Sequence, residues 1–216
     1  METMQETAKY LCENIQGCKM GYTQSDEITL LLTDYDTLTT DAWFDYNVQK
    51  MVSISASMAT LAFNKIFSKN VLYMKNSSMS EDYEAVNDSK SYKLSEEYSK
   101  KINSAMFDSR CFNIPKEEVA NCFIWRQQDA TRNSISMIAQ ANFSHKELQN
   151  KSTSDMQDML MLQKEINWNN FTPSEKRGTS VVKIKDIIEG AERNKWIIDK
   201  DTPIFSQNRE YIEKLI

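Results

Sequence analysis

Glycine and proline are scarce in this chain of 216 residues, which contains 4 glycines and 3 prolines. Turns between many short strands depend on these two residues, so their scarcity argues against an all-β fold and favours long helices. No apolar run approaches the roughly 18 residues that a membrane-spanning helix needs. No basic segment is followed by the apolar stretch of a signal peptide. The composition therefore predicts a globular, cytoplasmic protein without membrane segments.

Residues that bind soft metals are also few. A single histidine argues against a histidine-based zinc site. The four cysteines form no C-x-x-C pair, and we expect them to be reduced thiols in the core. The chain contains no Gly-rich phosphate loop, no dinucleotide-binding fingerprint and no recognisable nucleophile–histidine–acid triad. These absences exclude several common classes of nucleotide-binding protein and hydrolase.

Charge is unevenly distributed along the chain. The net charge is −5, whereas the first 45 residues alone carry nine acids and two lysines. The acidic part could bind cations, and the remaining, slightly basic part could contact phosphates in patches. Solvated surface charge is the alternative explanation of the same distribution.

Hydrophobic periodicity predicts an α+β fold in which long helices pack against an antiparallel sheet. The predicted helices cover 2–15, 42–68 and 115–142, and Ser144, Ser154 and Ser206 are expected to cap shorter ones. Thr40 or Asp41 is the expected cap of the second helix. The predicted strands are a hairpin from Cys18 to Leu32 and the segments 105–114, 179–185 and 196–198. We divide the chain into 1–69, a surface excursion over 70–104, and 105–216.

Two adjacent acids, Asp26 and Glu27, lie at the predicted tip of the hairpin. A carboxylate held at the end of a strand suits a Mg²⁺ site for phosphoryl or nucleotidyl transfer. Ser25 beside them could donate to phosphate oxygens. Chemistry that uses two metal ions needs a second carboxylate on a neighbouring strand, and no strand is predicted before the hairpin. The alternative is that these acids are solvated turn residues.

Two basic segments are candidates for phosphate binding. Arg126 lies in a predicted helix, and its planar guanidinium suits bidentate contacts with phosphate. Asp129 is three residues from both Arg126 and Arg132, so a structural ion pair with either arginine is the alternative. Lys176 and Arg177 precede a glycine, which would allow a close approach to phosphates. An exposed loop is the alternative interpretation of that pair.

Six short motifs follow one another along nearly the whole chain. They are Tyr22-x-Gln24-Ser25-Asp26-Glu27, Phe107-Asp108-x-Arg110-x-Phe112-Asn113, Trp125-Arg126-Gln127-Gln128-Asp129-Ala130-x-Arg132-Asn133-Ser134, Phe143-Ser144-His145-Lys146-Glu147-Leu148, Lys176-Arg177-Gly178-Thr179 and Pro203-Ile204-Phe205. In this order they resemble the tRNA(His) guanylyltransferase family, in particular its bacterial and phage branch of 3′–5′ RNA polymerases.

The resemblance implies a palm domain like that of polymerases or cyclases. It implies a nucleotidyltransferase that adds GMP or other nucleotides to the 5′ end of tRNA, after ATP or GTP has activated that end. Two Mg²⁺ ions assist both steps in the family. Carried over by motif, Asp26 and Glu27 are the catalytic and metal-binding residues. The positions that match nucleotide or tRNA contacts are Ser25, Lys50, Arg126, Asn133, Lys176 and Arg177.

The partners implied by the resemblance are tRNA(His) or 5′-truncated tRNAs, ATP, GTP and further copies of the chain in a tetramer. Family members open with a strand and an Arg-x-Asp-Gly motif, ahead of the helix that begins here near Met1. That stretch carries their first metal-binding aspartate, so we expect an N-terminally truncated palm. The alternative function is a catalytically inactive homologue that binds tRNA or an oligomer partner.

Overall fold

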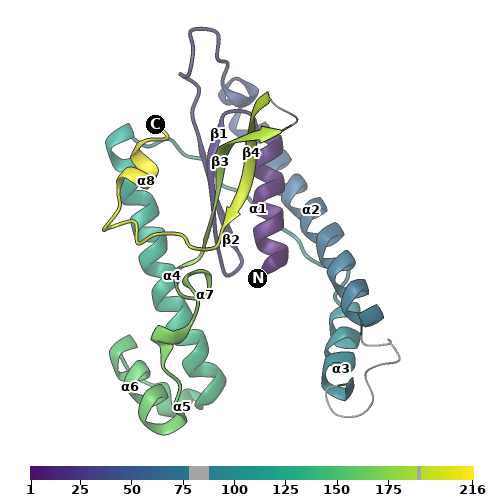
Figure 1. Cartoon of the computed structure of the whole chain (residues 1–216), viewed down its shortest axis with the longest axis vertical. Coiled ribbons are helices and arrows are strands. Elements are labelled where there is room, and N and C mark those ends of the chain that lie inside the picture. The colour runs from purple at the N-terminus through teal and green to yellow at the C-terminus, as the bar shows by residue number, and fades with distance from the viewer. Residues whose placement is uncertain (78–87, 189–190) are drawn as a thin grey trace. The chain divides into compact units, whose positions relative to one another are not determined.

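The computed structural model describes residues 1–77, 88–188 and 191–216 (Figure 1). Positions 78–87 of the predicted surface excursion therefore lie outside the described residues. The chain forms two compact units, the first comprising Met1–Cys18 and Leu32–Phe112 and the second Lys19–Leu31 and Asn113–Ile216. No helix within the described ranges is both long and apolar enough to cross a membrane.

The first unit is helical. Its first helix buries Met4, Ala8 and Leu11 on one face, which confirms the predicted amphipathic pattern. This helix packs against the second one, where the Asn70 amide donates to the Thr3 hydroxyl at 3.2 Å. The elements of this unit are α1 (Glu2–Asn14), η1 (Trp43–Tyr46), α2 (Val48–Ser77) and α3 (Asp88–Ser99).

The strand predicted over 105–114 is not formed, so this prediction was wrong. Side chains of α2 satisfy the backbone of the segment instead. The Asn64 amide donates to the Ala105 carbonyl at 2.9 Å and accepts from the Ala105 N–H at 3.2 Å. The Phe107 N–H donates to the Thr60 hydroxyl at 3.0 Å. These side chains occupy three backbone groups at the start of the segment, and the segment joins no sheet.

Helix α2 begins later than predicted. Neither predicted cap, Thr40 or Asp41, stands at its start, because its first residue is Val48. The side-chain oxygen of Asn47 accepts the N–H of Lys50 at 3.1 Å, which satisfies one of the free donors of the first turn. Asparagine is among the residues that favour this position, so Asn47 is the sequence signal for the helix start.

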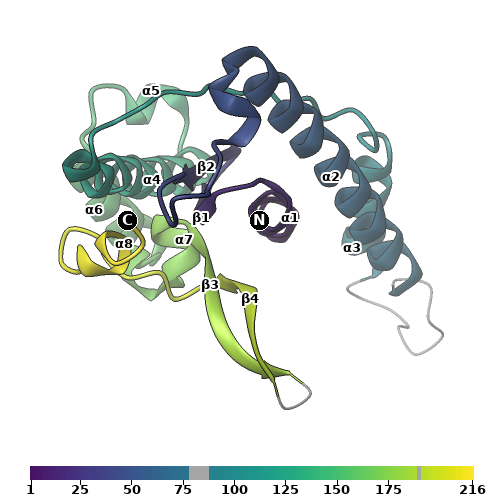
Figure 2. The same ribbon diagram turned by 90° about the horizontal axis from the view of Figure 1, so that it is seen from above.

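The second unit combines a sheet with one long helix and several short ones. Its elements are β1 (Cys18–Gln24), β2 (Glu27–Leu32), η2 (Lys116–Glu118), α4 (Val119–Asn142), α5 (His145–Leu148), α6 (Thr153–Lys164), η3 (Trp168–Asn170), α7 (Pro173–Arg177), β3 (Thr179–Ile188), β4 (Ala191–Asp199) and α8 (Glu210–Glu213). Helices α4 and α8 lie side by side in both views (Figure 1 and Figure 2).

Serine caps were predicted with mixed success. Ser144 caps α5 with a full capping box, as predicted. Helix α6 is capped by Ser152, not by Ser154, because Asp155 stands three residues after Ser152 and completes a capping box there. Helix α8 begins beyond Ser206 without a side-chain cap.

The four strands form one sheet in the order β2-β1-β3-β4. Strands β1 and β3 pair antiparallel with Tyr22 opposite Ser180, and β3 and β4 pair antiparallel with Val181 opposite Ile198. The antiparallel sheet with long helices confirms the predicted α+β class. Strands β3 and β4 are longer than predicted and extend as a hairpin (Figure 2).

Three aromatic rings form the centre of this unit's core. The Tyr22 ring meets Phe123 of α4 edge to face at a centroid distance of 6.4 Å and Phe205 at 5.5 Å. Met20 and Ile212 are fully buried in the same cluster. Edge-to-face pairs of this kind contribute about 0.5–1.5 kcal/mol beyond their buried area. The core therefore joins β1, α4 and the C-terminal segment.

Gly178 lies where α7 meets β3, in contact with β1. Its φ is +78°, and a Cβ added there would lie 2.6 Å from the Tyr22 hydroxyl and 2.7 Å from the Thr23 carbonyl oxygen. The Tyr22 hydroxyl donates to the Arg177 carbonyl at 2.5 Å, so this hydroxyl has little freedom to move away. Both the conformation and the close approach require glycine.

We expect Gly178→Ala to destabilise the folded state by about 2 kcal/mol or more, because it combines a left-handed φ with a backbone clash. Urea unfolding measures the change. Ser206→Ala, an exposed position in the same unit, is the control and should stay within about 0.5 kcal/mol of wild type. If Gly178→Ala were as stable as the wild-type protein, the junction of α7 and β3 would not require glycine at this position.

Candidate functional site

The β1–β2 turn carries the predicted acidic pair on a two-residue connection. Ser25 and Asp26 form the turn, and Ser25 has a φ of +48°. Both side chains are exposed, whereas Gln24 just before them is buried. Within the described ranges the Asp26 carboxylate has no hydrogen-bond or ion-pair partner. The turn therefore presents one uncompensated carboxylate to solvent.

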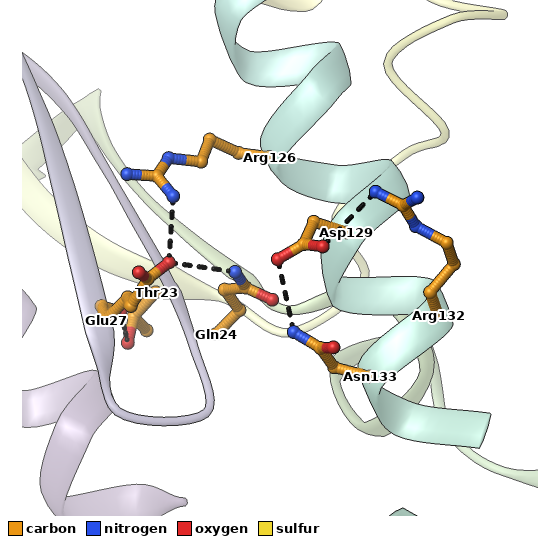
Figure 3. Close-up of polar contacts among 7 residues, drawn as sticks. All are labelled: Thr23, Gln24, Glu27, Arg126, Asp129, Arg132 and Asn133. Carbon is orange, nitrogen blue, oxygen red and sulfur yellow. Dashed lines mark hydrogen bonds and ion pairs between the residues drawn. The ribbon is translucent and has the colours of Figure 1, made fainter. Parts of the chain in front are cut away.

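Glu27, the first residue of β2, is bound from two sides (Figure 3). Its Oε2 atom accepts Nη1 of Arg126 at 3.0 Å and Nε2 of Gln24 at 3.1 Å. Its carbonyl oxygen accepts the Thr23 hydroxyl at 3.0 Å. The Arg126 guanidinium also lies 5.2 Å from the ring centroid of Trp125. The structure thus brings two predicted site residues, Glu27 and Arg126, into one ion pair.

Gln24 supports this ion pair from the interior. The residue is 7% exposed, and its Oε1 is buried without a hydrogen-bond partner in the described part of the chain. The orientation of the amide follows from chemistry, because the carboxylate of Glu27 must receive the NH₂ group rather than the carbonyl oxygen. A buried acceptor without a partner costs free energy, and this cost offsets part of what the contact with Glu27 contributes.

Asp129 forms a second polar cluster on α4, visible in Figure 3. Its Oδ1 accepts Nη2 of Arg132 at 3.2 Å, and its Oδ2 accepts the amide of Asn133 at 3.1 Å. Of the two alternatives for Asp129, the pair with Arg132 is therefore the one that forms. Asn133, a predicted contact for nucleotide or tRNA, is exposed on the same helix.

Lys176 and Arg177 end α7, and both side chains have structural contacts. Nζ of Lys176 donates to the Asn169 carbonyl at 2.9 Å and lies 5.4 Å from the Trp168 ring centroid. Nε of Arg177 donates to the Thr202 carbonyl at 2.9 Å. These contacts fix the direction of the two basic side chains, while each remains partly exposed.

Lys50, the remaining predicted site residue, belongs to the first compact unit. It lies in the first turn of α2 and is exposed, with Nζ 6.0 Å from the Phe44 ring centroid. The seven other predicted residues all lie in the second unit.

The acidic side chains of the turn supply only part of a divalent metal centre. Across the described residues no group of three or more histidine, cysteine, aspartate or glutamate side chains is arranged to hold a metal. Mg²⁺ is commonly held by one or two carboxylates together with water and substrate phosphates, so Asp26 fits one ligand position. Glu27 is compensated by Arg126. These residues do not supply the pair of free carboxylates that a two-ion centre requires.

Gln127 is a structural residue of the site helix whose role was not predicted. It is 5% exposed, and its amide donates to the Pro203 carbonyl at 2.9 Å and accepts the Phe205 N–H at 2.8 Å. It stands on the same helical face as Phe123 and Ala130, which are buried. A polar residue within an apolar face is the sequence signal that could have identified it.

The fold and the site define an α+β protein in which an acidic hairpin turn faces a long helix that carries arginines. A sequence model of the tRNAHis guanylyltransferase family matches residues 1–115. A bacterial tRNA(His) guanylyltransferase (Thg1)-like protein in complex with ATP is 45% identical, with a TM-score of 0.78 over 100% of this chain and 78% of that one. The chain belongs to the tRNAHis guanylyltransferase family, whose members are nucleotidyltransferases.

Further relatives extend this comparison. A bacterial tRNA(His) guanylyltransferase (Thg1)-like protein in complex with GTP is 41% identical, with a TM-score of 0.72 over 99% of this chain and 76% of that one. The tRNA(His) guanylyltransferase of Saccharomyces cerevisiae shares the fold at 18% identity and a TM-score of 0.56, over 89% of this chain and 74% of that one. An uncharacterized protein of Acanthamoeba polyphaga mimivirus, R259, is 25% identical over 210 residues, which are 93% of this chain. The match spans 66% of the viral protein's length.

The cap of α7 makes its stability dependent on pH. The Thr172 hydroxyl and N–H both donate to the Glu175 carboxylate, at 2.6 and 2.9 Å, and these bonds hold the pKa of Glu175 below its usual value. A lowered pKa stabilises the folded state above the unfolded pKa of about 4.3, and that stabilisation is lost as the pH falls through the folded pKa.

We therefore expect Glu175→Gln to be less stable than wild type at neutral pH, with a difference that shrinks as the pH falls below roughly 4. Urea unfolding over this pH range measures it. Glu165→Gln, at an exposed glutamate that caps no helix N-terminus, is the matched control. A difference from wild type that stays constant with pH would contradict the role of the carboxylate.

We expect Gln127→Leu to destabilise the fold by about 2–4 kcal/mol, because the Pro203 carbonyl and the Phe205 N–H would lose a buried partner. Chemical unfolding measures the loss. The neighbouring exposed Gln128→Leu should change stability by no more than about 0.5 kcal/mol. Similar values for the two variants would show that the buried amide does not hold the C-terminal segment on α4.

Proposed function

We propose that this protein transfers a nucleotide to the 5′ end of a tRNA, in the 3′–5′ direction, with ATP and GTP as substrates. The observation that carries the proposal is the 45% identity, over the whole chain, to a bacterial tRNA(His) guanylyltransferase (Thg1)-like protein in complex with ATP. The similarity to a further structure described in the same words, in complex with GTP, supports two nucleotide substrates.

The proposed reaction has two steps. An oxygen of the tRNA 5′-phosphate first attacks the α-phosphorus of ATP, and pyrophosphate leaves, so that the end becomes adenylylated. The 3′-hydroxyl of GTP then attacks the 5′-phosphorus of the tRNA, and AMP leaves. In both steps negative charge develops on phosphate oxygens in the transition state. The main catalytic requirement is therefore cationic and hydrogen-bonding groups positioned to stabilise that charge.

The side chains of the hairpin turn and of α4 have suitable chemistry for this task. The free carboxylate of Asp26 would be one ligand of Mg²⁺, which supplies charge neutralisation when it is bound. The Ser25 hydroxyl next to it would donate to a phosphate oxygen. Arg126, with Lys176 and Arg177, would contact the phosphates of a nucleotide or of the tRNA end. Asn133 and Lys50 would contribute further contacts to nucleotide or tRNA.

We further propose that the protein acts in the cytoplasm on tRNA(His) or on 5′-truncated tRNAs, and that it assembles as a homo-tetramer. These proposals rest on membership of the family.

The test is nucleotide transfer to 5′-monophosphorylated tRNA that lacks its first nucleotide, with Mg²⁺, ATP and labelled GTP. We expect label to enter the tRNA, and we expect Asp26→Ala to reduce the rate at least about a hundredfold because a charge-stabilising ligand is lost. Asp158→Ala, an exposed aspartate on α6, should retain wild-type activity. Folded protein that binds tRNA but incorporates no label would instead favour a binding partner without chemistry.

A further inference from the structure

The arginine proposed to contact phosphates already has a carboxylate partner. Arg126 and Glu27, which are 99 positions apart in the sequence, form an ion pair with an N–O distance of 3.0 Å. Because a guanidinium that binds a phosphate must give up or share its existing partner, the nucleotide has to compete with Glu27.

We propose that Glu27 is an internal counter-ion of Arg126 and that the polyphosphate of a nucleotide binds by displacing it. The proposal deepens the proposed function and rests on it for the identity of the ligand. Glu27 thereby acts as a positioning residue, holding the guanidinium at the turn until an anion with more charge arrives. A single carboxylate presents less charge than a polyphosphate, so exchange is favourable once the ligand is present.

The geometry suits a reversible contact. The side chains of Arg126 and Glu27 are 27% and 48% exposed, so water and ligands can reach both. Ion pairs that are exposed to this degree contribute little net stability, and exchange is therefore inexpensive. One guanidinium nitrogen, Nη1, makes the bond to Glu27, whereas a bidentate contact would be harder to replace. The neighbouring ring of Trp125, 56% exposed, offers a surface along which the guanidinium can move.

Gln24 explains why Glu27 would stay in place after the exchange. Its buried amide donates to Oε2, the same oxygen that Arg126 uses, and comes from the interior of the hairpin. The carboxylate therefore keeps one partner when the arginine leaves. Arg132 lacks this arrangement, because its partner Asp129 lies three residues away on the same helix and moves with it.

The proposal is tested by titrating sodium tripolyphosphate, in the presence of EDTA, and measuring the dissociation constant by calorimetry. We expect Glu27→Gln to bind about threefold more tightly than wild type, the size expected when a partly exposed ion pair no longer competes. Arg126→Gln should bind more weakly, and the double variant should show no gain over Arg126→Gln. A gain in affinity is a readout that structural damage would not produce.

Asp26→Asn is the charge-matched comparison. It removes the same negative charge one residue away, from a carboxylate that has no hydrogen-bond or ion-pair partner among the described residues. EDTA removes any effect through a metal ion. If Asp26→Asn and Glu27→Gln gain the same affinity for tripolyphosphate, the proposal is overturned, because removal of any nearby negative charge would then explain the effect. No gain for Glu27→Gln would also overturn it.

A 5′-phosphorylated RNA oligonucleotide, titrated in the same way, separates the two sources of phosphate. A gain for the RNA without a gain for tripolyphosphate would overturn the nucleotide as the displacing ligand. The tRNA transfer assay is independent of this titration. If the wild-type protein transfers label to tRNA but Glu27→Gln binds tripolyphosphate no more tightly than wild type, the counter-ion role is rejected and the proposed function stands.

Discussion

Tyr22 is the residue on which the arrangement of the second unit depends. Its ring contacts Phe123 of α4 and Phe205 of the C-terminal segment, and its hydroxyl donates to the carbonyl of Arg177. Burial raises the pKa of Tyr22 above its ordinary value of about 10, so the hydroxyl stays a protonated donor well above neutral pH. The Tyr22 side chain thereby fixes β1 against α4, against the C-terminal segment and against the end of α7, where Lys176 and Arg177 lie.

The position of the acidic turn follows from this anchor. Strand β1 is buried from Met20 through Gln24, and the chain reaches solvent within the next two residues. Such an abrupt change lets Glu27 be half exposed and still be bound by a buried amide from the same hairpin. A carboxylate on a long loop would lack that internal support, and its direction would be set by solvent alone.

Local patterns were predictable where local forces determine the structure. The apolar spacing of α1 alone was sufficient, because its packed face repeats with the helical period. The segment 105–114 has a strand-like composition, but Asn64 and Thr60 of α2 occupy its backbone groups, and no pattern within the segment reveals those partners. The N-cap of α6 could be predicted only from two residues together, the serine Ser152 and the acid Asp155 three positions later.

The residue types of the site were predictable from the motifs, whereas their pairing was not. Arg126 stands three positions from Asp129, a spacing worth only about 0.2–0.5 kcal/mol in a helix. Arg132 and Asn133 each donate to one oxygen of that carboxylate, whereas Arg126 donates to Glu27. The packing of the hairpin against the helix decides the partner, because it places the Glu27 carboxylate 3.0 Å from Nη1 of Arg126. Proximity in sequence left Asp129 open to either arginine, whereas the tertiary contact supplies Arg126 with a carboxylate that the Gln24 amide already holds.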